Sequence, residues 1–278
     1  MSALPIASVQ AAALTDVGRV RQINEDAVVA ADPVFMVADG MGGHEAGDTA
    51  SAIVAEEMRR LRGRPDVAVA EVKARISAAR QRIAALEASQ PDKQAGTTLS
   101  GVVVTLQNGQ PYWLVVNLGD SRTYRFAKQQ LEQLSVDHSE VQELVEGGRL
   151  SPEQARNHPR RNVVTKALGA GVSYEPDYWL VPINSDDRIL VCSDGLSTEV
   201  PDSVIAGLLA QHPDPDGAAE ALMDEALRAG AQDNVSVVVV NAVALPLPSD
   251  LDDTTVDHRA VSMDEDTIPR VNSLAGES

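Results

Sequence analysis

The chain has 278 residues, of which 44% are apolar, enough for a large hydrophobic core in one domain or two. Acidic residues outnumber basic ones by 41 to 23, and the formal net charge of −18 argues against nucleic-acid binding, because no Lys/Arg cluster outweighs that field. The single cysteine, Cys192, excludes an intrachain disulfide and fits a reducing compartment.

The N-terminal stretch, MSALPIASVQAAALTD, has no basic region ahead of its mildly apolar residues, which a signal peptide would need. No uncharged run along the chain approaches the roughly 20 residues that cross a bilayer. We therefore expect a cytoplasmic protein without a membrane span, and we expect it to be a monomer.

Apolar runs and helical periodicity alternate through the first half of the chain. Apolar residues three and four apart predict amphipathic helices over 45–62 and 67–89. Runs of apolar and β-branched residues predict four strands, at 34–38 (ending before Asp39-Gly40), 98–106, 112–118 and 121–127. Between two of these strands, Gln107-Asn108-Gly109-Gln110 predicts a hairpin.

Residues 137–168 return to a helical pattern. Within them, Ser151-Pro152-Glu153-Gln154 predicts a capped helix start, with serine at the N-cap, proline first and glutamine third. Further on, 188–192 predicts a strand that ends at Ser193-Asp194-Gly195, 217–230 a helix and 235–240 the last strand. We expect one domain over residues 1–245, which mixes mostly antiparallel strands with helices.

Four aspartates stand where predicted strands begin or end: Asp39, Asp120, Asp194 and Asp233. Core strands deliver their end residues to a common rim, and carboxylates that converge there stay ionised only with cations between them. Oxygen ligands alone select hard ions such as Mg²⁺ or Mn²⁺, and the five histidines lack the HxH and HExxH spacings of a zinc site. Because Asp-Gly after a strand is also a common turn, composition leaves a cation site and four separate turns equally open.

Seven segments in order match the motifs of a known family. They are TDVGRVRQINEDA (15–27), FMVADGMGGHEAGDTAS (35–51), AGTTLSGVVV (95–104), VNLGDSRTYRF (116–126), LSVDHSEVQELVEGGRLSPEQARNHPRRNVVTKALG (134–169), RILVCSDGLSTEV (188–200) and AGAQDNVSVVVV (229–240). Over roughly residues 10–240 the chain thus resembles the PPM family, the type 2C metal-dependent serine/threonine protein phosphatases, in its bacterial form. The resemblance implies an α+β fold of four layers, α-β-β-α, in which two mainly antiparallel sheets are flanked by helices.

The resemblance also implies a metal centre that holds Mn²⁺ or Mg²⁺, with two core ions and a weaker third. Asp39 matches the aspartate that bridges the two core ions, and Gly40 matches the glycine whose carbonyl binds one of them. Asp194 and Asp233 match the residues that complete the shell of the first ion. Asp120, together with Asp194, matches the site of the third ion in bacterial members.

The remaining roles concern the second ion and the substrate. Glu25 and Asp26 match a Glu-Asp pair that contacts the second ion through its shell, and Arg21 matches the arginine that holds the substrate phosphate. A planar guanidinium suits phosphate because it donates two parallel hydrogen bonds. Such enzymes hydrolyse phosphoserine and phosphothreonine in proteins with a hydroxide shared by two cations roughly 3.5–4 Å apart, and so oppose bacterial Ser/Thr kinases.

One departure from the family concerns the general acid. Eukaryotic relatives read DGH, whereas this chain reads Asp39-Gly40-Met41-Gly42-Gly43-His44. His44 can protonate the leaving group or merely open the helix at 45–62, and a metal-bound water can take the role instead.

The segment 134–169 matches the family's flap, where Arg160, Arg161 and Asn162 can contact substrate or cap local helices.

From Ser249 onward the chain carries eight acidic and two basic residues with no apolar periodicity, so we expect residues 246–278 to form a disordered tail. Thr254 in this tail, followed by Asp257, resembles a phosphothreonine ligand of forkhead-associated domains, although a tail that only solvates the protein is the plainer reading.

The rival reading of the whole chain is a pseudophosphatase that binds phosphoproteins without turnover. A complete set of matched aspartates and Arg21 argues against it.

Overall fold

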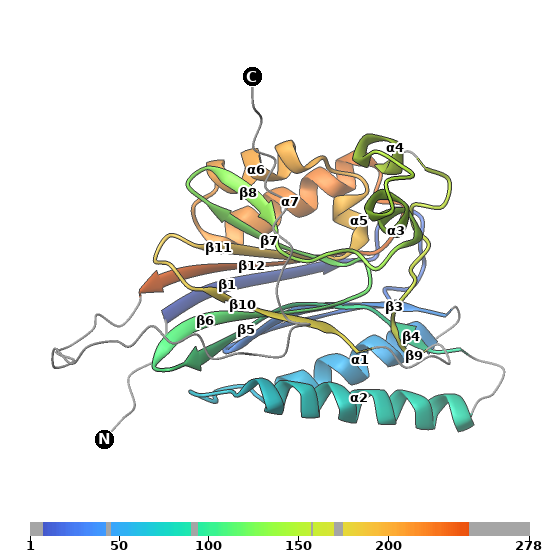
Figure 1. The fold of residues 1–278 in the computed structure, drawn as a ribbon. Coiled ribbons are helices and arrows are strands. Elements are labelled where there is room, and N and C mark those ends of the chain that lie inside the picture. The colour runs from blue at the N-terminus through green and yellow to red at the C-terminus, as the bar shows by residue number, and fades with distance from the viewer. Residues whose placement is uncertain (1–7, 43–45, 90–93, 157, 170–174, 245–278) are drawn as a thin grey trace, which may run out of the picture.

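A computed structural model describes residues 8–42, 46–89, 94–156, 158–169 and 175–244, and these fold in four layers (Figure 1). Helices α1 (Ala46–Arg59) and α2 (Val69–Ser89) cover one sheet, and α6 (Asp202–Gln211) and α7 (Pro215–Ala229) cover the other. The expected α+β sandwich is therefore confirmed. Within the described ranges, no helix has the length and apolar character needed to cross a membrane.

The sheet next to α1 and α2 has seven strands in the order β10-β6-β5-β3-β4-β9, with β2 also paired to β3. Their bounds are β2 (Asp26–Ala31), β3 (Val34–Met41), β4 (Gly96–Thr97), β5 (Leu99–Gln107), β6 (Gln110–Leu118), β9 (Leu168–Gly169) and β10 (Asp177–Pro182). The predicted hairpin joins β5 to β6, and its Asn108 and Gly109 have φ angles of 52° and 78°. Positive φ at both central residues is the requirement that Asn-Gly meets.

The second sheet has five antiparallel strands in the order β1-β12-β11-β7-β8. Their bounds are β1 (Ser8–Asp16), β7 (Arg122–Ala127), β8 (Gln130–Gln133), β11 (Arg188–Cys192) and β12 (Val235–Ala244). The short helix α5 (Asp194–Ser197) follows β11 directly. The predicted strands at 121–127, 188–192 and 235–240 all belong to this sheet.

The central strands are buried on both faces, which explains why they appear as unbroken apolar runs rather than as alternating patterns. In β12, Val237 and Val239 pack toward α5, α6 and α7, while Val238 and Val240 pack between the two sheets. The same two-residue period places Met36 against the α1–α2 layer. Three stacked apolar layers therefore fix the strands, and with them the residues at the strand ends.

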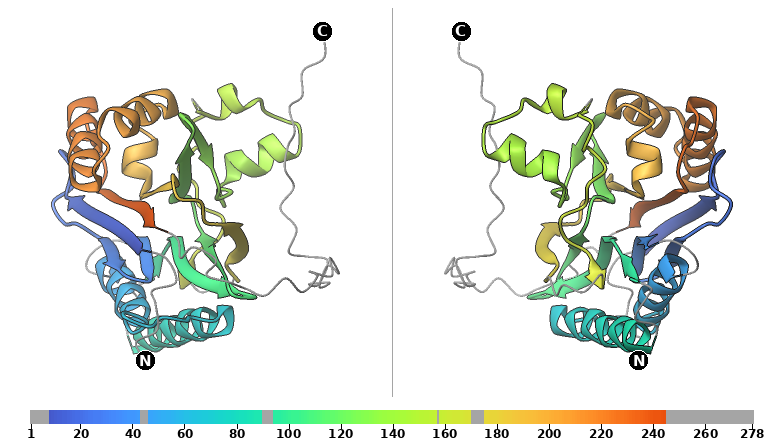
Figure 2. Two further views of the ribbon diagram at one scale, coloured as in Figure 1. Left: turned by 90° about the vertical axis from the view of Figure 1, so that its left-hand side faces the viewer. Right: turned by 90° about the vertical axis from the view of Figure 1, so that its right-hand side faces the viewer.

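The helical prediction for 137–168 is wrong in extent. Only α3 (Glu140–Glu146) and α4 (Pro152–Arg156) form there, and Figure 2 shows both standing apart from the α6–α7 layer. Gly147 and Gly148 end α3, and an isolated bridge between Ser139 and Val164 closes the segment. The predicted capping box is confirmed, because the Ser151 hydroxyl accepts the Gln154 N–H at 3.2 Å and Gln154 Oε1 accepts the Ser151 N–H at 2.8 Å.

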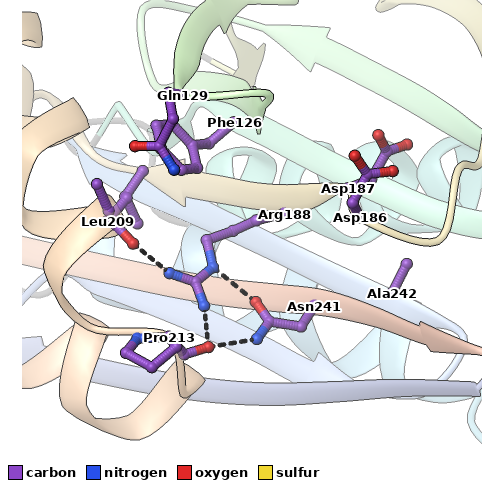
Figure 3. Close-up of a pocket in the computed structure, with 10 residues that line it drawn as sticks. Phe126, Gln129, Asp186, Asp187, Arg188, Leu209, Pro213, Asn241 and Ala242 are labelled. Carbon is purple, nitrogen blue, oxygen red and sulfur yellow. Dashed lines mark hydrogen bonds between the residues drawn. The ribbon is translucent and has the colours of Figure 1, made fainter.

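At the start of β11, the buried Arg188 holds the end of α6 in place (Figure 3). Its guanidinium donates to the carbonyls of Leu209 and His212, each at 2.6 Å, and to that of Pro213. Nε donates to Asn241 Oδ1 at 2.7 Å. A cation at the carbonyl end of a helix complements the helix dipole. Arg188 is therefore a structural clamp that joins the end of α6 to β11 and β12.

A buried glutamate joins α1 to α2. Glu57, whose side chain is 4% exposed, accepts from Arg82 at 2.8 Å and Arg75 at 3.3 Å, and lies 3.4 Å from Arg60. Glu57→Gln keeps the shape but removes the charge, so we expect the free energy of unfolding to fall by about 1.5–3 kcal/mol, the range for hydrogen bonds to charged groups. Urea unfolding with an unchanged slope checks this.

The neighbouring Glu56 provides the matched control for that substitution. It pairs with Arg60 and Arg82 but is solvent-exposed, so Glu56→Gln should destabilise the protein less than Glu57→Gln. Equal losses for the two variants would show that burial of Glu57 contributes nothing.

Candidate active site

Five aspartates, each in or next to a different strand, meet at one end of the two sheets, near the points where these strands begin or end. Asp39 lies in β3 and faces Asp26 of β2 in the strand register. Asp120 follows β6 and Asp194 follows β11, while Asp233 precedes β12, whose start lies beside the end of β11. The four aspartates predicted from strand ends are therefore brought together, and Asp26 joins them.

The carboxylates lie close enough to perturb one another. Burial raises the pKa of Asp39 well above its ordinary value, and four neighbouring charges raise it further, those of Asp26, Asp194, Asp120 and Asp233. Burial likewise raises the pKa of Asp194, with Asp120 as the largest charge contribution. Like charges at such range cannot all ionise without compensation.

Asp120 and Asp26 have intermediate environments. Burial and then the charge of Asp137 raise the pKa of Asp120 to about 7, although Arg122 opposes the rise. Burial raises the pKa of Asp26 to about 6, against the hydroxyls of Ser236 and Ser193, which lower it. Both carboxyls therefore change charge near neutral pH in the absence of a cation.

Two glycines in the Asp-Gly pairs serve close packing rather than turns. Strand β3 continues past Asp39 to Met41, so the predicted strand end at Asp39-Gly40 is wrong. A Cβ on Gly40 would lie 2.3 Å from the carbonyl oxygen of Gly47, and one on Gly195 would lie 2.0 Å from that of Asn234. The alternative of isolated Asp-Gly turns is therefore wrong for these two positions.

Arg21 reaches the cluster from the segment between β1 and β2. Its Nη2 donates to Asp233 Oδ2 at 2.7 Å, with half of the Arg21 side chain exposed. Burial lowers the pKa of Arg21, but the hydrogen bond and charge of Asp233 outweigh it and leave that pKa raised. The structure thus places the predicted phosphate-binding residue beside a predicted metal ligand.

Glu25 connects the two sheets through its backbone. Its N–H donates to Asn234 Oδ1 at 2.9 Å, and its carbonyl accepts from the Gly40 N–H at 3.2 Å and the Ser51 hydroxyl at 2.6 Å. The side-chain atom Oε1 lies near Gly47 at the start of α1. His44, the candidate general acid, falls outside the described residues.

The carboxylate cluster fits a hard cation, although the described residues contain no group of three Asp, Glu, His or Cys side chains already arranged around one point as ligands. Asp233 is occupied by Arg21 and by the Asn234 N–H at 2.8 Å. Oδ1 of Asp194 is buried without a hydrogen-bond partner. Burying an unpartnered carboxylate oxygen is costly, and a divalent cation would supply the missing charge and contact.

Sequence reasoning missed the residues that support Asp120. His138 Nδ1 accepts the N–H of Gly119, which precedes Asp120, at 3.1 Å, so Nε2 carries the proton that is donated to Asp177 at 3.0 Å. Arg122 binds Asp137 with contacts of 2.7 and 3.0 Å. The partners lie 15 to 39 residues apart, and only the adjacency of Asp137 and His138 in one motif could have drawn attention to them.

In the segment 134–169, the described structure gives one of the predicted substrate residues a local role. Arg160 pairs with Glu140 at 2.5 Å and so braces the start of α3. Arg161 and Asn162 are exposed.

Comparison with known proteins places this site in context. A family model described as protein phosphatase 2C matches residues 20–235. The serine/threonine protein phosphatase PstP of Mycobacterium tuberculosis is 38% identical over 269 residues, covering 95% of this chain and 50% of PstP, so the chain spans about half the length of that relative. The serine/threonine phosphatase stp of Listeria monocytogenes is 34% identical over 239 residues, covering 81% of this chain and 93% of stp.

A solved structure gives the same result. The crystal structure of the PstP catalytic domain in complex with 2 manganese ions matches with a TM-score of 0.77 and 37% identity, over 85% of this chain and 99% of that one. Because the family model covers most of the chain and relatives above 30% identity span it, the chain belongs to the protein phosphatase 2C family.

Proposed function

We propose that this chain hydrolyses phosphoserine and phosphothreonine in proteins and so opposes bacterial Ser/Thr kinases. The observation that carries the proposal is the cluster of buried and half-buried aspartates where strands of the two sheets begin and end, with the guanidinium of Arg21 against Asp233. Family membership and the names of PstP and stp support it.

The proposed cofactors are two Mn²⁺ or Mg²⁺ ions and a weaker third. Two manganese ions in the PstP structure support the first part. The residues proposed to hold the core ions are Asp39, the carbonyl of Gly40, Asp194 and Asp233, with Glu25 acting through the shell of the second ion. Asp120 and Asp194 are the proposed ligands of the third. Bound ions of this kind lower the pKa of a coordinated water and neutralise phosphate charge.

The chain's own residues have three proposed tasks. Arg21 binds the substrate phosphate with its paired N–H donors, from a segment exposed enough to admit a phosphoprotein loop. Asp39, within β3, and Asp194, just after β11, are proposed to hold the ions in place from a rigid frame. The buried frame around Asp120 excludes bulk water on the side of β6, since Asp120 is only 8% exposed.

Partners and location form a second part of the proposal. Phosphoproteins and their kinases are the proposed partners, and a forkhead-associated domain that binds the tail phosphorylated at Thr254 is a further one. This tail lies outside the described residues, so its support is the acidic sequence alone. A cytoplasmic monomer fits the single buried Cys192 and kinase-made substrates.

A chelator should abolish activity on a phosphopeptide, and added Mn²⁺ should restore it. Asp39→Asn and Asp194→Asn should each reduce kcat at least about tenfold, because each removes a charge proposed to position the ions. A pseudophosphatase would show no Mn²⁺-dependent turnover in the unmodified chain. Retention of most wild-type activity by either variant would contradict the two-ion assignment.

Arg21→Ala should raise KM for a phosphopeptide roughly ten- to a hundredfold, since a charge-assisted bidentate contact contributes about 1.5–3 kcal/mol. Mn²⁺ affinity, measured by calorimetry, should not weaken, because the substitution frees an oxygen of Asp233. Arg19→Ala is the matched control: Arg19 is exposed in the same segment, and its KM should equal the wild-type value. An unaltered KM in Arg21→Ala would remove Arg21 from the phosphate site.

The raised carboxyl pKa values predict how pH changes the stability of the metal-free protein. Asp120 binds its proton up to about pH 7 in the folded state, whereas the unfolded chain releases it near pH 3.8. The folded state therefore holds more protons between these values, so stability falls as pH rises through this window. Asp120→Asn should remove part of this fall, raising Tm in chelator at pH 8 while leaving Tm at pH 4 nearly unchanged. A Tm of the wild type that rises from pH 5 to 8 would contradict the electrostatic reading.

A further inference from the structure

We propose that Asn234 is a positioning residue, whose side chain holds the segment that carries Arg21 in line with the metal-binding residues. The inference rests on the proposed role of Arg21 in phosphate binding. Asn234 follows the predicted ligand Asp233 in sequence, but its own side chain points to a different task.

The amide of Asn234 makes three hydrogen bonds to one segment of backbone. Nδ2 donates to the carbonyls of Val17 at 3.0 Å and Ile23 at 2.9 Å, and Oδ1 accepts the Glu25 N–H at 2.9 Å. Asn234 is 5% exposed, so water competes little for these groups. Both amide protons and the carbonyl oxygen are thus committed to residues 17–25, which we call the Arg21 segment.

The contacts are placed so that they close the segment around Arg21. Val17 and Ile23 lie four residues before and two residues after Arg21, and one nitrogen atom binds both carbonyls. The N-terminal part of the Arg21 segment packs on the residues just before Asn234, because the Arg19 N–H donates to the Ala231 carbonyl at 2.8 Å. Gly18, with φ of 78°, leaves no room there for a side chain, because a Cβ would lie 2.1 Å from the Asp233 carbonyl oxygen.

The same side chain also ties the Arg21 segment to the opposite sheet. Glu25, held by Asn234 through its N–H, accepts the N–H of Gly40 with its carbonyl. Asn234 immediately precedes β12 of the five-stranded sheet, whereas Gly40 lies in β3 of the other. A single asparagine therefore sets the distance between Arg21, the proposed phosphate ligand, and Asp39, the proposed metal ligand that precedes Gly40.

Only an amide satisfies all three backbone groups at once. Aspartate would keep the acceptor for Glu25 but would turn an oxygen toward the carbonyls of Val17 and Ile23, and alanine would leave all three groups without this partner. Since half of the Arg21 side chain is exposed, its reach toward substrate depends on the backbone beneath it. Loss of the brace should therefore weaken phosphate binding more than it changes the ions.

The test is a double-substitution cycle with Asn234→Ala and Arg21→Ala, on the full chain in saturating Mn²⁺. We expect Asn234→Ala to raise KM for a phosphopeptide and Ki for inorganic phosphate at least about fivefold, and to change both less than about twofold once Arg21 is already alanine, because groups that act through each other are not additive. Mn²⁺ affinity by calorimetry should stay within about twofold of wild type.

Asn241→Ala is the control, from within the strand that Asn234 precedes. Asn241 also makes two side-chain hydrogen bonds, to Arg188 and Pro213, but at the other end of β12 (Figure 3). This variant should lower Tm without moving KM or Ki. If Asn234→Ala does not fold, Asn234→Ser replaces it in the cycle, because serine adds no charge that could interact with Arg21 in one background only.

Three results would overturn the inference. An equal rise of KM with and without Arg21 would mean that Asn234 acts independently of it, and a lowered Tm with unchanged KM and Ki would leave only a structural role. An unchanged KM in Arg21→Ala itself would overturn the proposed phosphate site together with this inference, and so is distinguishable from the first two results.

Discussion

Repulsion among buried carboxylates is the constraint on which the rest of this structure depends. Asp26, Asp39, Asp120 and Asp194 each have a pKa raised first by burial, and each feels the charge of at least one other aspartate. A flexible protein would relieve such repulsion by moving the groups apart. Here β3, β6 and β11, which position Asp39, Asp120 and Asp194, are buried on both faces by three apolar clusters, so the repulsion persists until protons or cations neutralise it.

The fold meets this constraint by drawing each carboxylate from a different strand. Antiparallel pairing brings the end of β11 beside the start of β12, and the β2–β3 register sets Asp26 opposite Asp39. Glycines at 40 and 195 allow neighbouring backbones to approach within contact of these positions. The clamp at Arg188 and the Glu57 pairs lie away from the cluster and stabilise the frame without adding charge to the site.

The sequence predicted the central strands better than the strands toward the edges of the sheets. Long apolar runs identified β3, β5, β6, β11 and β12, and a serine–glutamine pair identified the start of α4. Strands β1, β2 and β10 were missed because their exposed faces dilute the apolar pattern, and α6 because only Ile205 and Leu209 in it are buried. In the site, strand-end aspartates could be found by position, and Arg21 and Glu25 by family motif. The hydrogen bonds of His138 and Asn234 reach partners up to 217 residues away, which no local pattern records.

The pairing of Arg21 with Asp233 bears on both cation binding and phosphate binding. Without a cation, the guanidinium supplies positive charge to a carboxylate at the rim of the cluster. Both partners are more than one-third exposed, so this ion pair is worth little, about 0–1 kcal/mol by comparison with similar surface pairs. A divalent cation held by the proposed ligands would compete with Arg21 for Asp233, because it can bind several carboxylates at once. In the proposed site, a guanidinium released from Asp233 in this way would be available to the phosphate of a substrate. The brace formed by Asn234 would keep it within reach when that exchange occurs.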